Sequence, residues 1–190
     1  MSAESTGLGQ FVQAFAAARL LLQRAHEHGF LIEGMVLYVS LIDGLLRTAI
    51  ILDKQLAGDP VTVGDYVEQV PGGAKFTERE IYREARRRGV IDEILENEVG
   101  NLYEYRNAIV HRFFLTRLQY ADLAPYLVRY ELVYDQCSAI VEALEDRQVR
   151  EGKGMTVEGA PADRQAVLAE VLAKLGFNPD LSERGPVGSS

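Results

Sequence analysis

Apolar residues recur along this chain at the three- and four-residue spacing of α-helices, and no long segment alternates as a β-strand does. The spacing predicts helices over residues 11–27, 33–56 and 122–150. The helix over 33–56 carries the widest apolar face, so we expect it to be largely buried and to end at Gly58-Asp59-Pro60. The helix over 122–150 has a heptad seam that suits packing within a bundle, formed by Leu127, Tyr130, Tyr134, Cys137, Val141 and Leu144.

Two more helices are expected between these segments. Thr77 and Glu80 have the spacing of a capping box, which predicts a short arginine-rich helix ending at Gly89. The proline-free segment 91–115 carries an apolar repeat made of Leu95, Val99, Leu102, Ile109 and Phe113. The loop-rich stretch before residue 74 has room for one short helix. Residues 1–150 are therefore expected to form an all-α bundle of four to five main helices.

The C-terminal residues have a different composition. Residues 151–161 are glycine-rich and resemble a linker, and residues 163–175 have the pattern of one more amphipathic helix. A loose tail rich in Gly, Ser and Pro follows. We expect residues 151–190 to be an appendage that docks on this bundle or binds another protein.

Composition limits the class of protein. A chain of 190 residues with 47% hydrophobic residues is long enough for one domain with a real core. The single cysteine, Cys137, excludes an internal disulfide, fits a reducing compartment and lies on an apolar helical face, so a buried structural thiol is expected. The N-terminus lacks the basic start of a secretory signal, and no apolar run approaches the ~20 residues of a membrane span. We expect a soluble, cytoplasmic protein with no membrane partner.

Positive charge is concentrated in one part of the chain. The formal net charge is −8 and the pI is about 5.0, which argues against a generic nucleic-acid binder. Residues 79–129, however, hold nine arginines against eight acidic residues. This region is either a solvated face or the surface that meets an anionic ligand.

Residues 105–114 read YRNAIVHRFF and place an arginine where the helical repeat expects an apolar residue. Arg106 needs a partner there, because burying an unpaired charge is very costly. Asn107 and His111 lie roughly 100° and 140° around the helix from Arg106. These three side chains, which can bind a phosphate and move a proton, thus share one sector of a helix.

An arginine, four intervening residues and a histidine, with asparagine directly after the arginine, on a long helix of an α bundle, resembles the HEPN superfamily. The apolar segment YVSLIDGLLRTAIIL, with Asp43 and Arg47 one turn apart, also resembles the early core helix of that fold. The resemblance covers about residues 11–150. It implies Arg106, Asn107 and His111 as site residues.

This resemblance also implies a function. Members are typically small homodimers, and many are metal-independent endoribonucleases found as toxins or defence nucleases, which act on RNA and have an antitoxin or regulatory protein as partner. Others keep the bundle without the activity. In toxins paired with a nucleotidyltransferase antitoxin, a tyrosine two residues after the histidine is modified; Phe113 stands there, and Tyr103 and Tyr105 do not replace it.

The chemistry of these residue types fits RNA cleavage without a metal or cofactor. The reaction needs a base for the ribose 2′-OH, an acid for the departing 5′ oxygen and positive charge on the phosphorane. His111 can serve either proton role near neutral pH, and Arg106 offers a planar fork of donors. One histidine cannot stand on both sides of the scissile bond, so we expect a two-fold dimer that brings two copies of the helix together. Gly100 is on the same side as His111 and lets a twin helix approach.

Several neighbouring residues are weaker candidates. Glu104 is a candidate for orienting the His111 imidazole, although a solvent-exposed glutamate is the favoured reading, and Asp43 is a second candidate orienting residue. The candidate RNA-binding residues are three arginines that precede the helix of the motif, Arg86, Arg87 and Arg88, and one that directly follows His111, Arg112. A basic run near a helix end is also favourable without any ligand.

Other sites are not supported by the sequence. His26 and His28 lie about 200° apart on a helix and cannot chelate one metal, so no metal site is expected. The glycines at 72–73 and 152–154 lack the spacing of a phosphate-binding loop.

Three functions remain open. The first is a dimeric HEPN-type endoribonuclease. The second is a catalytically inactive HEPN-like dimerisation, sensor or protein-binding module, in which Arg106 is a structural ion-pair residue, with Asp43 or another acid as partner, and His111 a boundary histidine. The third is a helical adaptor whose acidic surface binds a basic partner.

Overall fold

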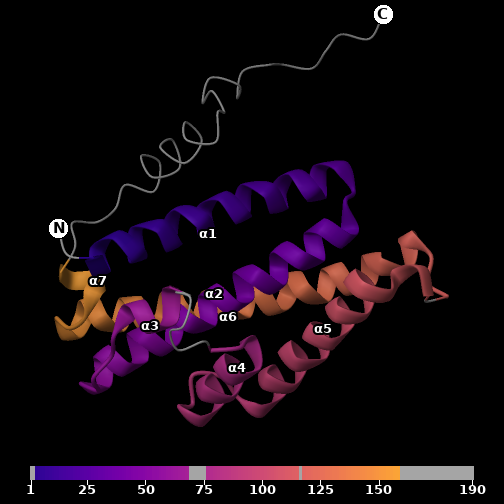
Figure 1. The fold of residues 1–190 in the computed structure, drawn as a ribbon. Coiled ribbons are helices and arrows are strands. Elements are labelled where there is room, and N and C mark those ends of the chain that lie inside the picture. Colours follow the sequence, from indigo (N-terminus) through magenta and orange to yellow (C-terminus); the bar gives the residue numbers. More distant parts are fainter. Residues whose placement is uncertain (1–2, 69–75, 116, 159–190) are drawn as a thin grey trace, which may run out of the picture.

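A computed structural model describes residues 3–68, 76–115 and 117–158, and its regular elements in these ranges are all helical (Figure 1). The all-α class is confirmed. The α-helices are α1 (Ala3–His28), α2 (Leu31–Ala57), α3 (Val63–Val67), α4 (Glu78–Arg87), α5 (Glu93–Arg112), α6 (Ala124–Glu151) and α7 (Met155–Glu158). Two short 3-10 helices, Phe113–Leu115 and Tyr120–Leu123, lie between α5 and α6.

Helix α2 is the centre of the bundle. It contacts α1, α4, α5 and α6, and its most extensive contact is with α6. In Figure 1, α1 lies along one side of α2, whereas α4 and α5 lie on the other. Leu46, Ile50 and Leu52 are fully buried, as the wide apolar face of this segment predicts.

The apolar character of α2 corrects one expectation. The helix has 27 residues, and its most apolar window has a mean hydropathy of 1.9, so by length and composition it is able to cross a membrane. The statement that no apolar run approaches this length was therefore wrong. Within the bundle, 72% of that window is buried, which is what the core helix of a soluble bundle shows.

The heptad seam of α6 packs against α2, as predicted. Tyr130, Cys137 and Val141 are buried, and Leu127, Tyr134 and Leu144 are partly buried against the same core. Burial raises the pKa of the Cys137 thiol to about 12, so the thiol stays protonated near neutral pH. The expected buried, structural role of this cysteine is confirmed.

Helices α4 and α5 form an antiparallel pair that carries the candidate site. The predicted capping box begins α4: Thr77 Oγ1 accepts from the Glu80 N–H, and Glu80 Oε2 accepts from the Thr77 N–H. Gly89 has φ +74°, the left-handed conformation that lets the chain reverse between the two helices. The Asp92 carboxylate then caps α5 by accepting from the Leu95 N–H at 2.8 Å.

The segment after α6 packs on the bundle for at least one helical turn. Gln148 is fully buried; its amide donates to Leu52 O and Gln55 Oε1 and accepts from the Thr156 N–H. Helix α7 is thereby attached to α2 within the stretch that composition marks as a linker. The helix expected over 163–175 lies outside the described residues.

Candidate functional site

Arg106 is held from two sides at the junction of α4 and α5. Its Nη2 donates to Glu78 Oε1 at 2.9 Å, and its guanidinium lies 5.0 Å from the centre of the Tyr103 ring. The side chain is 20% exposed, and the Nε atom is buried without an acceptor among the described residues. The arginine thus has the acidic partner that its position requires, and this partner is Glu78 in the first turn of α4.

Asp43 has a different role from the one considered. Its Oδ2 accepts from Arg47 Nε at 2.6 Å, and Arg47 also donates to Tyr66 O and Phe76 O at 2.9 and 2.8 Å. Burial raises the pKa of Asp43, although Arg47 acts in the opposite direction. The pair therefore anchors the residues just before α4 to the core, and the ion-pair partner of Arg106 is Glu78 and not Asp43.

His111 and Asn107 lie on the open side of α5. His111 is exposed in the last turn of the helix, and Asn107 is partly exposed. Within the described ranges, no hydrogen bond or ion pair joins either side chain to another residue. Because His111 is five positions after Arg106, the two residues are about 7.5 Å apart along the helix axis. The imidazole is accessible to a substrate or to a second copy of the chain.

Glu104 pairs with Arg79 of α4 and is exposed. The structure therefore places its carboxylate on an arginine of the neighbouring helix, and shows no contact that orients the imidazole of His111.

The candidate RNA-binding arginines separate into two groups. Arg88 is partly buried and donates to Asp53 and Asp59 at 2.7 and 2.8 Å, so it fastens the end of α4 to the end of α2. Arg86, Arg87 and Arg112 are exposed. The basic run therefore contributes one structural residue and two that face solvent.

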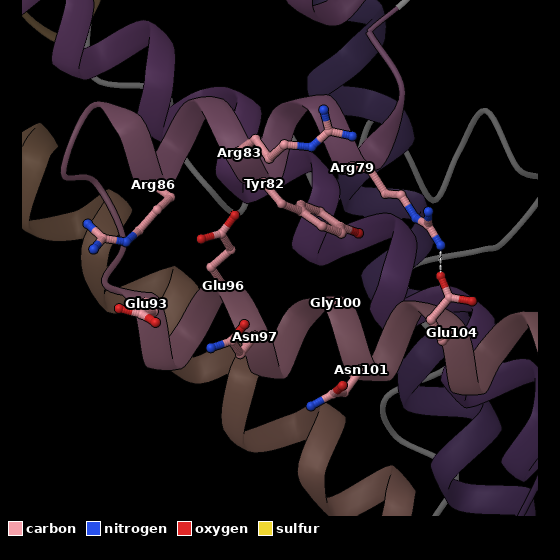
Figure 2. A pocket seen from close by; sticks show the side chains of 10 residues that line it. All are labelled: Arg79, Tyr82, Arg83, Arg86, Glu93, Glu96, Asn97, Gly100, Asn101 and Glu104. Atoms are coloured by element: carbon pink, nitrogen blue, oxygen red, sulfur yellow. Dashed lines mark hydrogen bonds and ion pairs between the residues drawn. The ribbon is translucent and has the colours of Figure 1, made fainter.

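An open pocket of about 620 Å³ lies between α4 and α5 (Figure 2). Three arginines line its α4 wall: Arg79, Arg83 and Arg86. Acidic and amide side chains line its α5 wall, among them Glu93, Glu96 and Glu104. Sequence reasoning missed Arg79 and Arg83, although their spacing with Arg86, four and three residues apart, places the three on one helical face.

The outer face of α5 borders this open pocket, and Glu104 is the residue of this face that pairs with α4, through Arg79. Asn97, Asn101, Glu104 and Ala108 are exposed along this face. A Cβ added at Gly100 would meet no neighbouring atom within 4 Å. The face is thus free to receive another helix, and His111 lies within about 20° of Gly100 around α5.

Exposed apolar side chains continue beside this face. Ile94 is 79% exposed on α5, and Val128 and Leu132 are exposed on α6. The ion pair of Glu98 with Arg129 at 2.7 Å brings these turns of the two helices together. Exposed apolar side chains on neighbouring helices are typical of surfaces that bind another protein.

His26 and His28 are exposed at the end of α1, and no group of three His, Cys, Asp or Glu with metal-binding geometry occurs in residues 3–68, 76–115 and 117–158. Comparison of the chain with protein-family models, with curated proteins and with solved structures found no match.

Proposed function

We propose that the protein is a metal-independent endoribonuclease of the HEPN type that acts as a homodimer. Arg106 stabilises the phosphate charge, His111 transfers protons and Asn107 orients the substrate. One observation carries the proposal: a half-buried, restrained arginine and a solvent-open histidine lie within two turns of one helix whose outer face is uncovered.

The arginine is suited to charge stabilisation because it is held in place before the substrate arrives. Glu78 and Tyr103 fix the guanidinium with one ion pair and one ring contact. A positively charged group that is already oriented is an effective stabiliser of the phosphorane, once the phosphate shares it with Glu78 or displaces that carboxylate.

The histidine supports a dimeric site. His111 has no partner on its own chain within the described residues that would hold it as a structural residue. If two α5 helices pack side by side and nearly parallel about a two-fold axis, with Gly100 at their contact, the two exposed imidazoles face one cleft, so that one acts as base and the other as acid. Such an enzyme would work in the cytoplasm, under the control of an antitoxin or another regulatory protein.

A second candidate is a catalytically silent dimerisation or sensor module. It is favoured by the Arg106–Glu78 ion pair, which already neutralises the arginine. In that case the same α5 face joins two subunits and no RNA is cleaved.

The test is incubation of the purified protein with end-labelled single-stranded RNA in EDTA. The nuclease should cleave and leave a 2′,3′-cyclic phosphate, since the 2′-OH is the nucleophile. His111→Ala should reduce the rate about 10²- to 10⁴-fold. His26→Ala, which removes another exposed histidine, should leave the rate unchanged.

The dimer is measured by light scattering in the same samples. Intact RNA in the presence of a wild-type dimer contradicts the nuclease and supports the silent module. Cleavage that EDTA abolishes contradicts the metal-independent mechanism.

A further inference from the structure

The acidic and basic side chains of α4 point to different sides of the helix. Its two acidic residues that face the bundle are engaged: Glu78 with Arg106, and Glu84 with the Tyr66 hydroxyl at 2.9 Å and with Lys54 at 3.5 Å. The third, Glu80, is used in the capping box. The outward side therefore presents mainly arginines.

These arginines form one wall of the α4–α5 pocket. Figure 2 shows Arg79 and Arg86 reaching towards α5 at the two ends of the pocket, with Glu96 rising from α5 between them. Arg79 is paired with Glu104, but no ion pair within 4 Å joins Arg83 or Arg86 to an acidic residue of the described chain. Two guanidinium groups are thus available to an anion.

The opposite wall has the complementary character. Glu93 and Glu96 supply carboxylate acceptors, and Asn97 and Asn101 supply amides. A ligand that fits both walls has an anionic edge and, parallel to it, a neutral edge that bears hydrogen-bond donors. A single RNA strand has this form, because its phosphates lie on one side and its base edges on the other.

We propose that the α4–α5 pocket binds the single strand of RNA that leads to His111, and favours bases with exocyclic amino groups over uracil. This inference rests on the proposed function for its substrate class. Phosphates contact Arg83 and Arg86, while Glu93 and Glu96 accept from cytosine, adenine or guanine amino groups. Uracil offers carbonyl oxygens on the corresponding edge, which the carboxylates repel.

The pocket extends along α5 from Glu93 to Glu104, which is the direction of His111. Arg86 faces the start of α5 and Arg79 pairs with Glu104, seven residues before His111. From the Arg86 end, at the start of α5, to His111 the path is about 27 Å along the helix, the span of a short oligonucleotide. An acidic peptide fits less well, because the α5 wall would repel it.

The test measures fluorescence anisotropy with 2′-O-methyl oligonucleotides of about 12 residues, a length within known single-strand site sizes. Because the 2′-OH is blocked, binding is measured without cleavage. Arg83→Gln with Arg86→Gln should weaken oligo(C) binding at least about tenfold and reduce the salt slope by about 1.4, at 0.7 per phosphate contact. Arg19→Gln with Arg150→Gln changes the net charge equally, at exposed positions on α1 and α6, and should alter binding less than about twofold.

A second variant tests the base preference. Wild-type protein should bind oligo(C) at least about threefold more tightly than oligo(U), and Glu96→Gln should remove this difference. Circular dichroism and light scattering check that each variant keeps its fold and oligomeric state.

The proposal is overturned if both arginine pairs lose binding equally, if wild-type protein does not bind, or if polyglutamate competes as well as RNA. It is also overturned if the Arg83 and Arg86 variant loses the dimer, because the pocket would then join two copies. If the protein binds RNA in this pocket but does not cleave it, the pocket assignment stands and the nuclease proposal fails. If the Arg83 and Arg86 variant cleaves RNA as fast as the wild type, the nuclease proposal stands and the pocket assignment fails.

Discussion

At the scale of single residues, the ion pair between Arg106 and Glu78 decides how the site meets a phosphate. The carboxylate uses one amino group of the guanidinium, at 2.9 Å, and both side chains keep partial exposure. A phosphate must therefore share the arginine with Glu78 or displace it. Glu78 lowers the positive charge that RNA encounters, and so weakens the resting affinity of the site.

Replacing Glu78 with Gln should tighten RNA binding, because the neutral amide still accepts from Arg106 but no longer opposes the phosphate. The slope of log affinity against log salt should steepen by about 0.7, the value of one added phosphate contact. Anisotropy with uncleavable RNA measures both quantities. Glu98→Gln is the matched control, since Glu98 pairs with Arg129 on the α6 side of α5.

An unchanged salt slope in the Glu78 variant, with the fold retained, would mean that Arg106 does not contact phosphate.

The placement of the candidate site residues around α5 could be predicted from the sequence, but their partners could not. Helical period places Arg106 on the inner stripe and His111 on the open side, because both follow from position along one helix. Glu78 and Arg79 reach α5 from another helix, 28 and 25 residues earlier. Such pairs depend on how α4 packs, which no local pattern encodes. For the same reason Arg88 was expected at the surface, whereas it reaches Asp53 and Asp59.

At the scale of elements, α5 is covered on its inner side and open on its outer side. Gly100 has no side chain on the open side of the helix, and a Cβ built there would have no neighbouring atom within 4 Å. Another helix can therefore approach the α5 backbone closely at this residue. Glycine is costly inside a helix unless another element approaches it. Two occupants account for this open position: a second helix that packs there in the proposed dimer, or a ligand of the α4–α5 pocket, which Gly100 also lines.

Two substitutions at Gly100 test this reading in opposite directions. Gly100→Ala should raise the stability of the monomer by about 0.5–1 kcal/mol, because it removes the conformational freedom of glycine without a clash. Gly100→Trp should leave the helical spectrum intact and convert the dimer to monomer, measured by light scattering.

Gly9→Trp is the matched control for the tryptophan, since Gly9 also lies in a helix with open space around it. A Gly100→Trp protein that remains dimeric would exclude this face as the interface.

The positions of the long helices were predicted closely by the three- and four-residue spacing of the apolar residues. The expected spans 33–56 and 122–150 correspond to α2 and α6, because long amphipathic runs with glycine at the ends are local signals. Helix α1 begins before the expected residue 11, in a stretch that includes Gly7 and Gly9 and carries no clear apolar stripe. The short α7 was missed because it depends on Gln55, 100 residues before Met155, and on the buried amide of Gln148.

At the level of the whole molecule, three tyrosines in the core make the free energy of unfolding depend on pH in the alkaline range. Burial is the main cause that raises the pKa of Tyr38, Tyr82 and Tyr130 above the ordinary value. A raised folded-state pKa means that the unfolded chain releases these protons first. Their contribution to stability is complete below the unfolded value of about 10 and is lost as the pH rises above it.

We therefore expect the free energy of unfolding to fall steeply above about pH 10. Tyrosinate absorbance for these side chains should appear together with the loss of helical dichroism, and not before it. Tyr38→Phe should make the decline with pH shallower. Ionisation of all nine tyrosines in a fully helical protein would contradict the burial on which this expectation rests.

In the proposed dimer, two copies that meet along α5 would bring both His111 rings, with Arg106 and Arg112 near them, to one cleft. The shared cleft is tested by the RNA cleavage rate, in EDTA, of dimers from wild-type and His111→Ala chains co-expressed at graded ratios. If each site needs both imidazoles, the rate follows the square of the wild-type fraction. A rate that falls in direct proportion to that fraction, or no cleavage by the wild-type dimer, contradicts it.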